Sequence, residues 1–278
     1  MDDLMLPLDL PRLRQERLSA EPFPHVKIEP FLKPEVAQAI ADAYPSLDQA
    51  RTLGHEFRFV NETGKIQITD SARFPEPIKA LDQLLASPSF LAQLSQVTGI
   101  EDLLADPALS GGGMHMTGSQ GRLDVHVDFN IETKTQLHRR INLLLYFNPE
   151  WRPEWHGAVE LWDRDVKKRH HAFAPLLNRC VIFETSQISY HGVEQVDCPP
   201  GMARKSFATY YYTKQPPAQW NGVTHNTIFR ARPDEKLKGY VLMPAERVAR
   251  TVGKGLRRVY GFAERRILGG AGDDEKKS

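Results

Sequence analysis

The triplet His126-Val127-Asp128 opens residues 123–212, the stretch of sequence that decides the fold. The same stretch later contains His191 and closes with the run RKSFATYYYT, which begins at Arg204. Side chains alternate between the two faces of a β-strand, so His126 and Asp128 are expected to point to the same side. The pair can therefore contribute two ligands to one metal ion.

Short apolar runs follow this pair. Residues 140–148, 158–162 and 179–183 are predicted to be strands, and a further strand begins at Arg204. Several short strands separated by turns favour an all-β barrel or sandwich. His191 falls just past the strand predicted over 179–183.

Two imidazoles and one carboxylate form the facial ligand set of non-haem Fe(II) oxygenases, which leaves the other face of the metal open. A His-x-Asp triplet alone is weak evidence, because about one His-x-Asp/Glu triplet is expected by chance in a chain with 10 His and 35 Asp+Glu. The order His126, Asp128, His191, Arg204 makes the interpretation more specific. The alternative is an ordinary surface pair of His126 and Asp128.

Residues 111–214 resemble the double-stranded β-helix, or jelly-roll, core of the Fe(II)- and 2-oxoglutarate-dependent dioxygenases, and in particular the prolyl-4-hydroxylase-like branch. The resemblance rests on five elements: His126-x-Asp128, the run LLYFN at 144–148 before a tryptophan-containing turn, the run GAVELW at 157–162, His191-Gly-Val, and Arg204-x-Ser206. One departure is visible. Where this branch often has a Gly-Gly pair, the chain has His156-Gly157.

The resemblance implies a mostly β protein with flanking helices (α+β) that hydroxylates an unactivated C–H bond and releases succinate and CO₂. His126, Asp128 and His191 would be the catalytic metal ligands. The implied cofactors are Fe(II), the cosubstrate 2-oxoglutarate and O₂, with ascorbate as a further candidate. Arg204 would bind the far carboxylate of 2-oxoglutarate, because a guanidinium matches a carboxylate with two parallel hydrogen bonds. Ser206, on the same strand face, would add a hydroxyl donor.

Tyr146 and Asn142 share a face of the strand predicted over 140–148. By resemblance to prolyl hydroxylases, Tyr146 would reach the same carboxylate and Asn142 would line its pocket; the alternative for Tyr146 is a packed core tyrosine. Lys205 is expected to point away and to be solvated. Arg139 and Arg140 are expected at a solvated strand end, with an acidic part of the substrate as the alternative partner.

The loop before residues 158–162 carries two further candidates. Trp155 and His156 lie there and are expected to be near the substrate. Four further histidines outside the metal set are interpreted as structural or surface residues, because a lone histidine has such a role more often than it binds a metal. These are His115, His138, His170 and His171.

Three regions are predicted along the chain: a support region over 1–110, the jelly-roll core over 111–214, and an extension over 215–278. The support region is expected to contain, in order, an irregular lead-in at 1–20, a strand at 22–28, a helix from Pro34, a hairpin at 55–69 with its turn at 62–65, and two helices within 75–100. No role is assigned to residues 218–243.

Residues 244–268 form the most periodic part of the extension. Apolar residues recur at intervals of three and four and are surrounded by arginines and lysines, which predicts a basic amphipathic helix. Such a helix either packs its apolar stripe on the domain or makes peripheral contact with an anionic membrane surface or an acidic partner.

Composition limits the function classes. The net charge is +1, so no overall field attracts nucleic acid. The two cysteines, Cys180 and Cys198, are predicted to be reduced thiols rather than a disulfide framework. No signal peptide and no apolar stretch of membrane-spanning length is found, which favours a cytoplasmic protein.

The substrate stays open at this level. A prolyl residue or free amino acid, another small molecule, a peptide and a glycan all remain candidates, because one fold serves many substrates. Two alternatives keep the jelly roll without oxidation: a cupin-like metal-binding isomerase and a non-catalytic binding protein. A cupin has no need for Arg204-x-Ser206 at this place.

Overall fold

The computed structural model describes residues 2–235 and residue 243. The chain divides into one unit of Met1–Pro233 and a second of Asp234–Ser278, and the fold and the site lie in the first. The basic helix predicted over 244–268 lies outside the described residues. Within the described part of the chain, no helix is long and apolar enough to cross a membrane.

The described helices are α1 (Leu10–Leu18), α2 (Pro34–Ala43), α3 (Leu47–Leu53), α4 (Glu76–Leu85) and α5 (Pro88–Thr98), with short 3-10 turns at Asp2–Leu4, Ser71–Arg73 and Pro153–Trp155. The described strands are β1 (His25–Ile28), β2 (His55–Arg58), β3 (Glu62–Ile68), β4 (Leu104–Ala105), β5 (Gly113–Val127), β6 (His138–Tyr146), β7 (Val159–Trp162), β8 (Arg169–Phe173), β9 (Cys180–Glu184), β10 (His191–Val193), β11 (Arg204–Thr213) and β12 (Ile228–Phe229).

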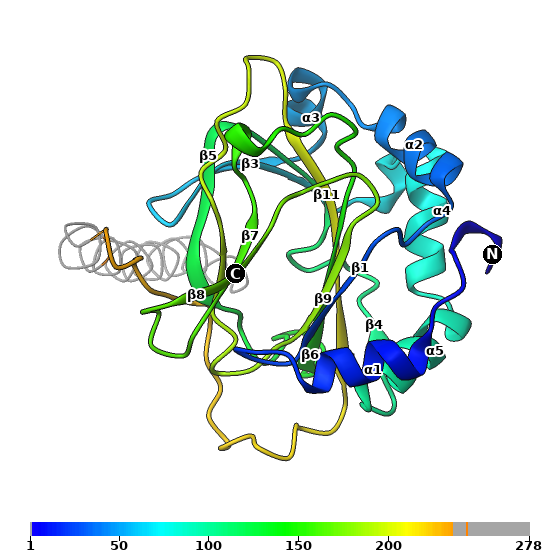
Figure 1. Cartoon of the computed structure of the whole chain (residues 1–278), viewed down its shortest axis with the longest axis vertical. Coiled ribbons are helices and arrows are strands. Elements are labelled where there is room, and N and C mark those ends of the chain that lie inside the picture. Colours follow the sequence, from blue (N-terminus) through cyan, green and yellow to red (C-terminus); the bar gives the residue numbers. More distant parts are fainter. Residues whose placement is uncertain (1, 236–242, 244–278) are drawn as a thin grey trace, which may run out of the picture. The chain divides into compact units, whose positions relative to one another are not determined.

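The strands form one strongly curled sheet (Figure 1). Its main path is β1-β9-β6-β11-β5-β10-β7-β8; β3 and β12 pair with β5 beside this path, β2 pairs with β3, and β4 pairs with β11. Strand β5 belongs to both halves of this sheet. Its first half pairs with β11, where Thr117 lies opposite Arg204, and its second half pairs with β10, where His126 lies opposite His191. This is a double-stranded β-helix with flanking helices, as predicted.

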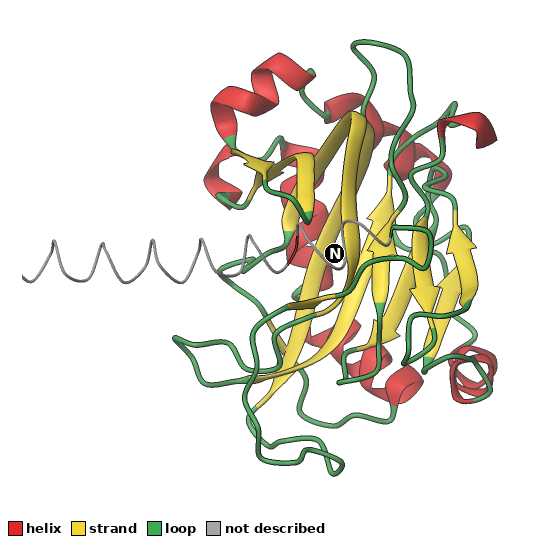
Figure 2. Ribbon diagram, turned by 90° about the vertical axis from the view of Figure 1, so that its left-hand side faces the viewer, coloured by secondary structure: helices red, strands yellow, loops and turns green. Residues whose placement is uncertain are grey.

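The helices lie outside the strands, with α1, α2, α4 and α5 on the side of β1, β9, β6 and β11 (Figures 1 and 2). Their apolar faces are buried in one cluster with the sheet: Ile40, Leu81 and Leu94 of the helices pack with Leu143 of β6 and Phe207 of β11. The predicted helices in the support region are therefore present and cover the sheet. The opposite face of the same strands is left free to carry polar groups.

The lead-in at 1–20 is not irregular, and that expectation is wrong. Helix α1 forms there because the Asp9 side chain accepts a hydrogen bond from the Arg12 amide, and a proline stands in the first turn. Leu13 and Arg17 are buried, and Arg17 forms an ion pair with Glu184 of β9. The helix is thus fixed by tertiary contacts that its short pattern does not signal.

The hairpin at 55–69 is present, but its turn is not where we expected it. Residues 62–65 lie inside β3, and the chain reverses at 59–61, where Phe59 and Glu62 exchange backbone hydrogen bonds. Gly64 has φ +69°, and a Cβ atom there would lie 2.8 Å from the Cα of Gly121. The glycine therefore serves a close approach to β5 rather than the turn.

Residues 228–230, within the segment that has no predicted role, run along the end of β5. Strand β12 pairs with it so that Phe229 lies opposite His126, and the ring centroids of these two residues are 5.3 Å apart. Arg232 forms an ion pair with the buried carboxylate of Glu160 on β7. This segment packs beside a candidate metal ligand. Cys180 and Cys198 are both buried free thiols, as predicted.

Candidate metal and cosubstrate site

The structure brings His126, Asp128 and His191 together. His126 lies near the end of β5, Asp128 follows that strand, and His191 begins β10 directly opposite His126. One potential ligand atom from each residue lies within 4.8 Å of the others, and all three residues are buried. No other group of three potential ligands this close occurs among the described residues. The sequence order therefore becomes one compact cluster.

Hydrogen bonds fix which nitrogen of each imidazole faces this cluster. Nδ1 of His126 donates to the Asp124 carbonyl at 2.8 Å, and Nδ1 of His191 donates to the Ser189 carbonyl at 2.9 Å. Because a carbonyl oxygen only accepts, each Nδ1 carries a proton, and Nε2 is the nitrogen that holds the lone pair when the imidazole is neutral. The two Nε2 atoms lie 3.6 and 3.4 Å from the Asp128 carboxylate oxygens.

Asp128 is held as a carboxylate by its neighbours. Burial would raise its pKa, but the guanidinium of Arg139, whose Nη2 lies 3.3 Å from Oδ2, holds the pKa well below its usual range. Asn142 donates from Nδ2 to the same Oδ2 at 2.7 Å, and its own Oδ1 accepts from Nε of Arg139 at 3.0 Å. The carboxylate is thus ionised and oriented.

Arg139 is not at a solvated strand end, and that expectation is wrong. Its side chain is buried, and its guanidinium lies 3.5 Å from the ring centroid of Tyr210. The register between β6 and β11 shifts between Ile141 and Arg139, so an extra residue, Arg140, is inserted there. This bulge turns Arg139 to the face of Asn142, which strict alternation would not predict.

Arg204 lies buried at the other end of the same cavity. Its Nε donates to the Gly157 carbonyl at 2.7 Å and its Nη1 to Oγ of Ser206 at 3.2 Å. Its guanidinium carbon lies 4.9 Å from the ring centroid of Tyr146, which stands opposite Ser206 in the sheet. Arg204, Ser206 and Tyr146 therefore lie together at this end, whereas Asn142 lies against Asp128.

The residues present fit an iron ion and a dicarboxylate. Two neutral imidazoles and one carboxylate are the donors that Fe(II) takes in a facial set. At the far end, no carboxylate of the described residues pairs with the buried Arg204 guanidinium. The hydroxyl of Tyr146 is also buried beside the Arg204 guanidinium, and among the described residues no acceptor or donor meets it with the geometry of a full hydrogen bond. An anionic oxygen at this end would satisfy both groups.

Gly157 contributes a function that its sequence motif did not reveal. It has φ +75°, and a Cβ atom there would lie 3.2 Å from Cδ of Arg204 and 3.1 Å from Cγ2 of Val196. The glycine lets its carbonyl approach and orient Arg204. Trp155 and His156, in contrast, do not line the cavity between the metal cluster and Arg204. They also do not line the cavity on the other side of Asp128.

Two cavities meet at the metal cluster and share Asp128. The inner cavity extends from the cluster to Arg204 and Ser206 and is also lined by Lys65 and His115. The outer cavity, of about 440 Å³, extends to the loops that follow β9 and β11. Lys65 was missed because only the β2–β3 hairpin, far away in sequence, brings it here.

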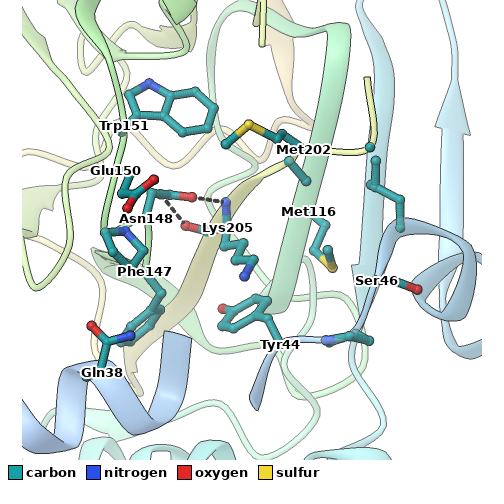
Figure 3. A pocket seen from close by; sticks show the side chains of 15 residues that line it. Gln38, Tyr44, Ser46, Met116, Phe147, Asn148, Glu150, Trp151, Met202 and Lys205 are labelled. Atoms are coloured by element: carbon teal, nitrogen blue, oxygen red, sulfur yellow. Dashed lines mark hydrogen bonds between the residues drawn. The ribbon is translucent and has the colours of Figure 1, made fainter. Parts of the chain in front are cut away.

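A third cavity, of about 510 Å³, lies on the opposite face of β11 (Figure 3). Lys205 points into it between Tyr44 and Met116. Its Nζ donates to the Ala41 carbonyl at 3.1 Å and the residue is half-buried, so the expectation of a solvated lysine is wrong. This cavity contains none of the three clustered metal-binding candidates.

Together these features define a jelly-roll protein with a candidate three-ligand metal centre beside a buried arginine. Comparison with known proteins agrees with the resemblance found in the sequence. Residues 112–212 match the model of the 2OG-Fe(II) oxygenase superfamily. Members of this superfamily use Fe(II) and 2-oxoglutarate.

Several individual proteins are similar to this chain. A prolyl 3-hydroxylase of Mus musculus, OGFOD1, is 29% identical over 201 residues, which is 70% of this chain and 34% of that protein. The chain thus spans about a third of the length of this relative. A Pseudomonas putida prolyl-4-hydroxylase matches with a TM-score of 0.52 and 16% identity, over 74% of this chain and 100% of that one.

A second solved structure supports the same fold. It is a prolyl hydroxylase of Trichoplax adhaerens in complex with a fragment of the hypoxia inducible factor oxygen degradation domain. It matches with a TM-score of 0.52 and 16% identity, over 74% of this chain and 89% of that one. The two structural matches establish the jelly-roll fold of the chain.

Burial of His191 makes stability depend on pH in the metal-free protein. Burial, followed by the neighbouring His126, lowers the pKa of His191 to about 4, whereas an unfolded histidine titrates near 6.5. Between these values the unfolded chain binds the proton more readily, so stability falls as the pH drops. We expect His191 to account for a loss of about 2 kcal/mol between pH 7 and pH 5.

Urea unfolding with a chelator present measures this effect. The unfolding free energy of the wild type minus that of His191→Gln should decrease by this amount over the interval, because glutamine does not titrate. Parallel pH profiles of the two proteins would show that His191 does not have a lowered pKa.

Proposed function

We propose that this chain is an Fe(II)- and 2-oxoglutarate-dependent dioxygenase in which His126, Asp128 and His191 bind the iron. The observation that carries the proposal is the pairing of this buried cluster with a second buried group, the Arg204 guanidinium, across one cavity. A metal-binding protein without a dicarboxylate cosubstrate has no need to bury a cation there, because burying an unpaired charge is costly.

When bound, iron and 2-oxoglutarate supply the chemistry in which O₂ oxidises 2-oxoglutarate to succinate and CO₂ and one oxygen atom enters a substrate C–H bond. The side chains of this protein bind and orient the reactants. Arg204, with Ser206 and Tyr146, binds the far carboxylate of the cosubstrate through charge-assisted hydrogen bonds. The burial of all these groups excludes water from the reacting atoms.

Arg139 and Asn142 act through Asp128 rather than on the reactants. Asn142 fixes the orientation of the Asp128 carboxylate, and Arg139 keeps it ionised. Partners of metal ligands commonly affect metal affinity by about 10- to 100-fold. We therefore assign Asn142 to the metal end of the cavity, and Tyr146 to the carboxylate end.

The first candidate substrate is a prolyl residue. The support for it is the 29% identity with a mouse prolyl 3-hydroxylase, of which this chain spans a third. A cytoplasmic location and the region boundaries near residues 110 and 214 also remain proposals. A metal-binding isomerase is the competing function, and the buried Arg204 weighs against it.

Uncoupled turnover tests the proposed function without knowledge of the substrate. The purified chain, supplied with Fe(II), ascorbate, O₂ and 2-oxoglutarate, should form succinate at a slow rate that chelation of iron abolishes. Succinate formation measured by mass spectrometry with labelled 2-oxoglutarate gives the readout. Iron binding without any succinate would contradict the dioxygenase and favour the isomerase or a binding protein.

A further inference from the structure

The outer cavity reaches the metal cluster from the side that the cosubstrate does not occupy. It shares Asp128 with the inner cavity but contains neither Arg204 nor Ser206. Two loops form its rim, residues 185–190 after β9 and residues 214–223 after β11. A molecule in this cavity would therefore approach the metal beside Asp128.

The charged groups of this cavity are already paired. Arg139 is bound to Asp128 and Asn142, and Glu184 forms an ion pair with the buried Arg17. Burial lowers the pKa of His138, which keeps this imidazole neutral at neutral pH. Among the described residues of the wall, no spare charge is left to match a carboxylate, a phosphate or an ammonium group.

Most polar side chains of the wall are also engaged with one another. Thr185 donates to Asn142 at 3.2 Å, and Asn130 donates to the Val223 carbonyl at 2.8 Å. Gln187 and Asn221 join the two rim loops through their amides, at 2.9 and 3.4 Å. A glycan needs many free hydrogen-bond partners, so this wall suits it poorly.

Apolar surface is what the cavity offers. Trp220 donates its indole N–H to the Val223 carbonyl at 3.2 Å. The rest of its ring is apolar and lines the cavity. Phe23 and Pro24 lie across the cavity in the same lining. At the rim, Ile188 lines the same cavity and is 41% exposed, so its side chain is accessible to a molecule bound there.

We propose that the outer cavity binds the primary substrate and that Trp220 and Ile188 select an uncharged, apolar residue within a peptide. This inference rests on the proposed function. A residue inside a peptide has no free ammonium or carboxylate, so it fits walls whose charges are paired. A free amino acid carries both charges and would bind without compensation for either. The peptide flanks of that residue would contact the exposed rim at Ile188.

The test uses the full chain loaded with Mn(II) and N-oxalylglycine and a library of N-acetylated, C-amidated pentapeptides with apolar central residues, proline included. Isothermal titration calorimetry measures binding, and succinate formation measures coupling in the iron form. We expect members of the library to bind and to raise succinate formation. Free L-proline, the same peptides with phosphoserine at the centre, and neutral oligosaccharides should bind at least about 10-fold more weakly.

Two variants locate the binding site. Trp220→Ala should weaken peptide binding by about 10-fold or more, because an aromatic wall of the cavity is lost. Ile188→Gln should weaken it by about 3-fold, and this exposed residue can be changed without affecting the fold. The matched control is Met202→Gln in the third cavity, where an apolar side chain that is 37% exposed should be replaced without effect on binding or on uncoupled turnover.

Three results would overturn this inference. They are binding of free proline, phosphopeptide or oligosaccharide as tight as that of the capped peptides, no binding by any library member, and full peptide affinity in both rim variants. Uncoupled succinate formation by the wild type, measured first, separates these results from failure of the proposed function, because it needs no primary substrate.

Discussion

Asp128→Ala should weaken Fe(II) binding by at least about 100-fold, since the anionic ligand of the cluster disappears. The same variant should form no succinate. Removal of the carboxylate also leaves the buried Arg139 guanidinium facing the site without its partner at 3.3 Å. A cation there repels a divalent metal ion. The loss should therefore exceed that of one ligand bond alone.

Anaerobic titration with Fe(II) in the presence of 2-oxoglutarate measures this prediction through the charge-transfer band of the complex. His191→Ala is an independent second variant and should lose the band as well. Asp165→Ala is the matched control, because Asp165 is an exposed carboxylate paired only with Lys167 at 3.7 Å. A band of full strength in either site variant would remove that residue from the metal site.

Arg204→Ala should raise the KM for 2-oxoglutarate by about 100-fold, while metal binding stays within a few-fold of the wild type. The guanidinium is buried and is the group that would neutralise the far carboxylate. Arg204→Lys keeps the charge but cannot present a planar fork, so it should recover only part of the affinity.

Lys205→Ala is the matched control for this prediction. It is the next residue of the same strand, but its side chain points into the third cavity on the opposite face (Figure 3). Its loss should change the KM by no more than about 3-fold, because a half-buried lysine bonded to a carbonyl contributes little elsewhere. Equal KM values for Arg204→Ala and the wild type would exclude Arg204 from the cosubstrate site.

The part of the site that sequence reasoning could predict depends on strict strand alternation and on the order of motifs. His126 and Asp128 share a face because no irregularity separates them, and Arg204 and Ser206 do so for the same reason. The fold class was predictable from the same short strands. Family resemblance then supplied the third ligand, His191, which the β5–β10 register places opposite His126.

What could not be predicted depends on irregularities and on distant contacts. The bulge at Arg140 reverses the face of Arg139, and no residue type marks it in the sequence. Helix α1 forms through burial of Leu13 and Arg17 against parts of the chain that its own pattern does not reveal. Gly157 is required because it lies beside Arg204 in space, although the two residues are 47 positions apart along the chain, with β7 to β10 between them.

A crystal structure of the full chain with Mn(II) and N-oxalylglycine tests the central claim most directly. We expect one metal ion bound by Nε2 of His126, Nε2 of His191 and an oxygen of Asp128, at about 2.0–2.3 Å. We also expect the far carboxylate of the 2-oxoglutarate mimic to contact the Arg204 guanidinium. A metal ion bound elsewhere, or a mimic whose far carboxylate does not contact Arg204, would contradict this claim.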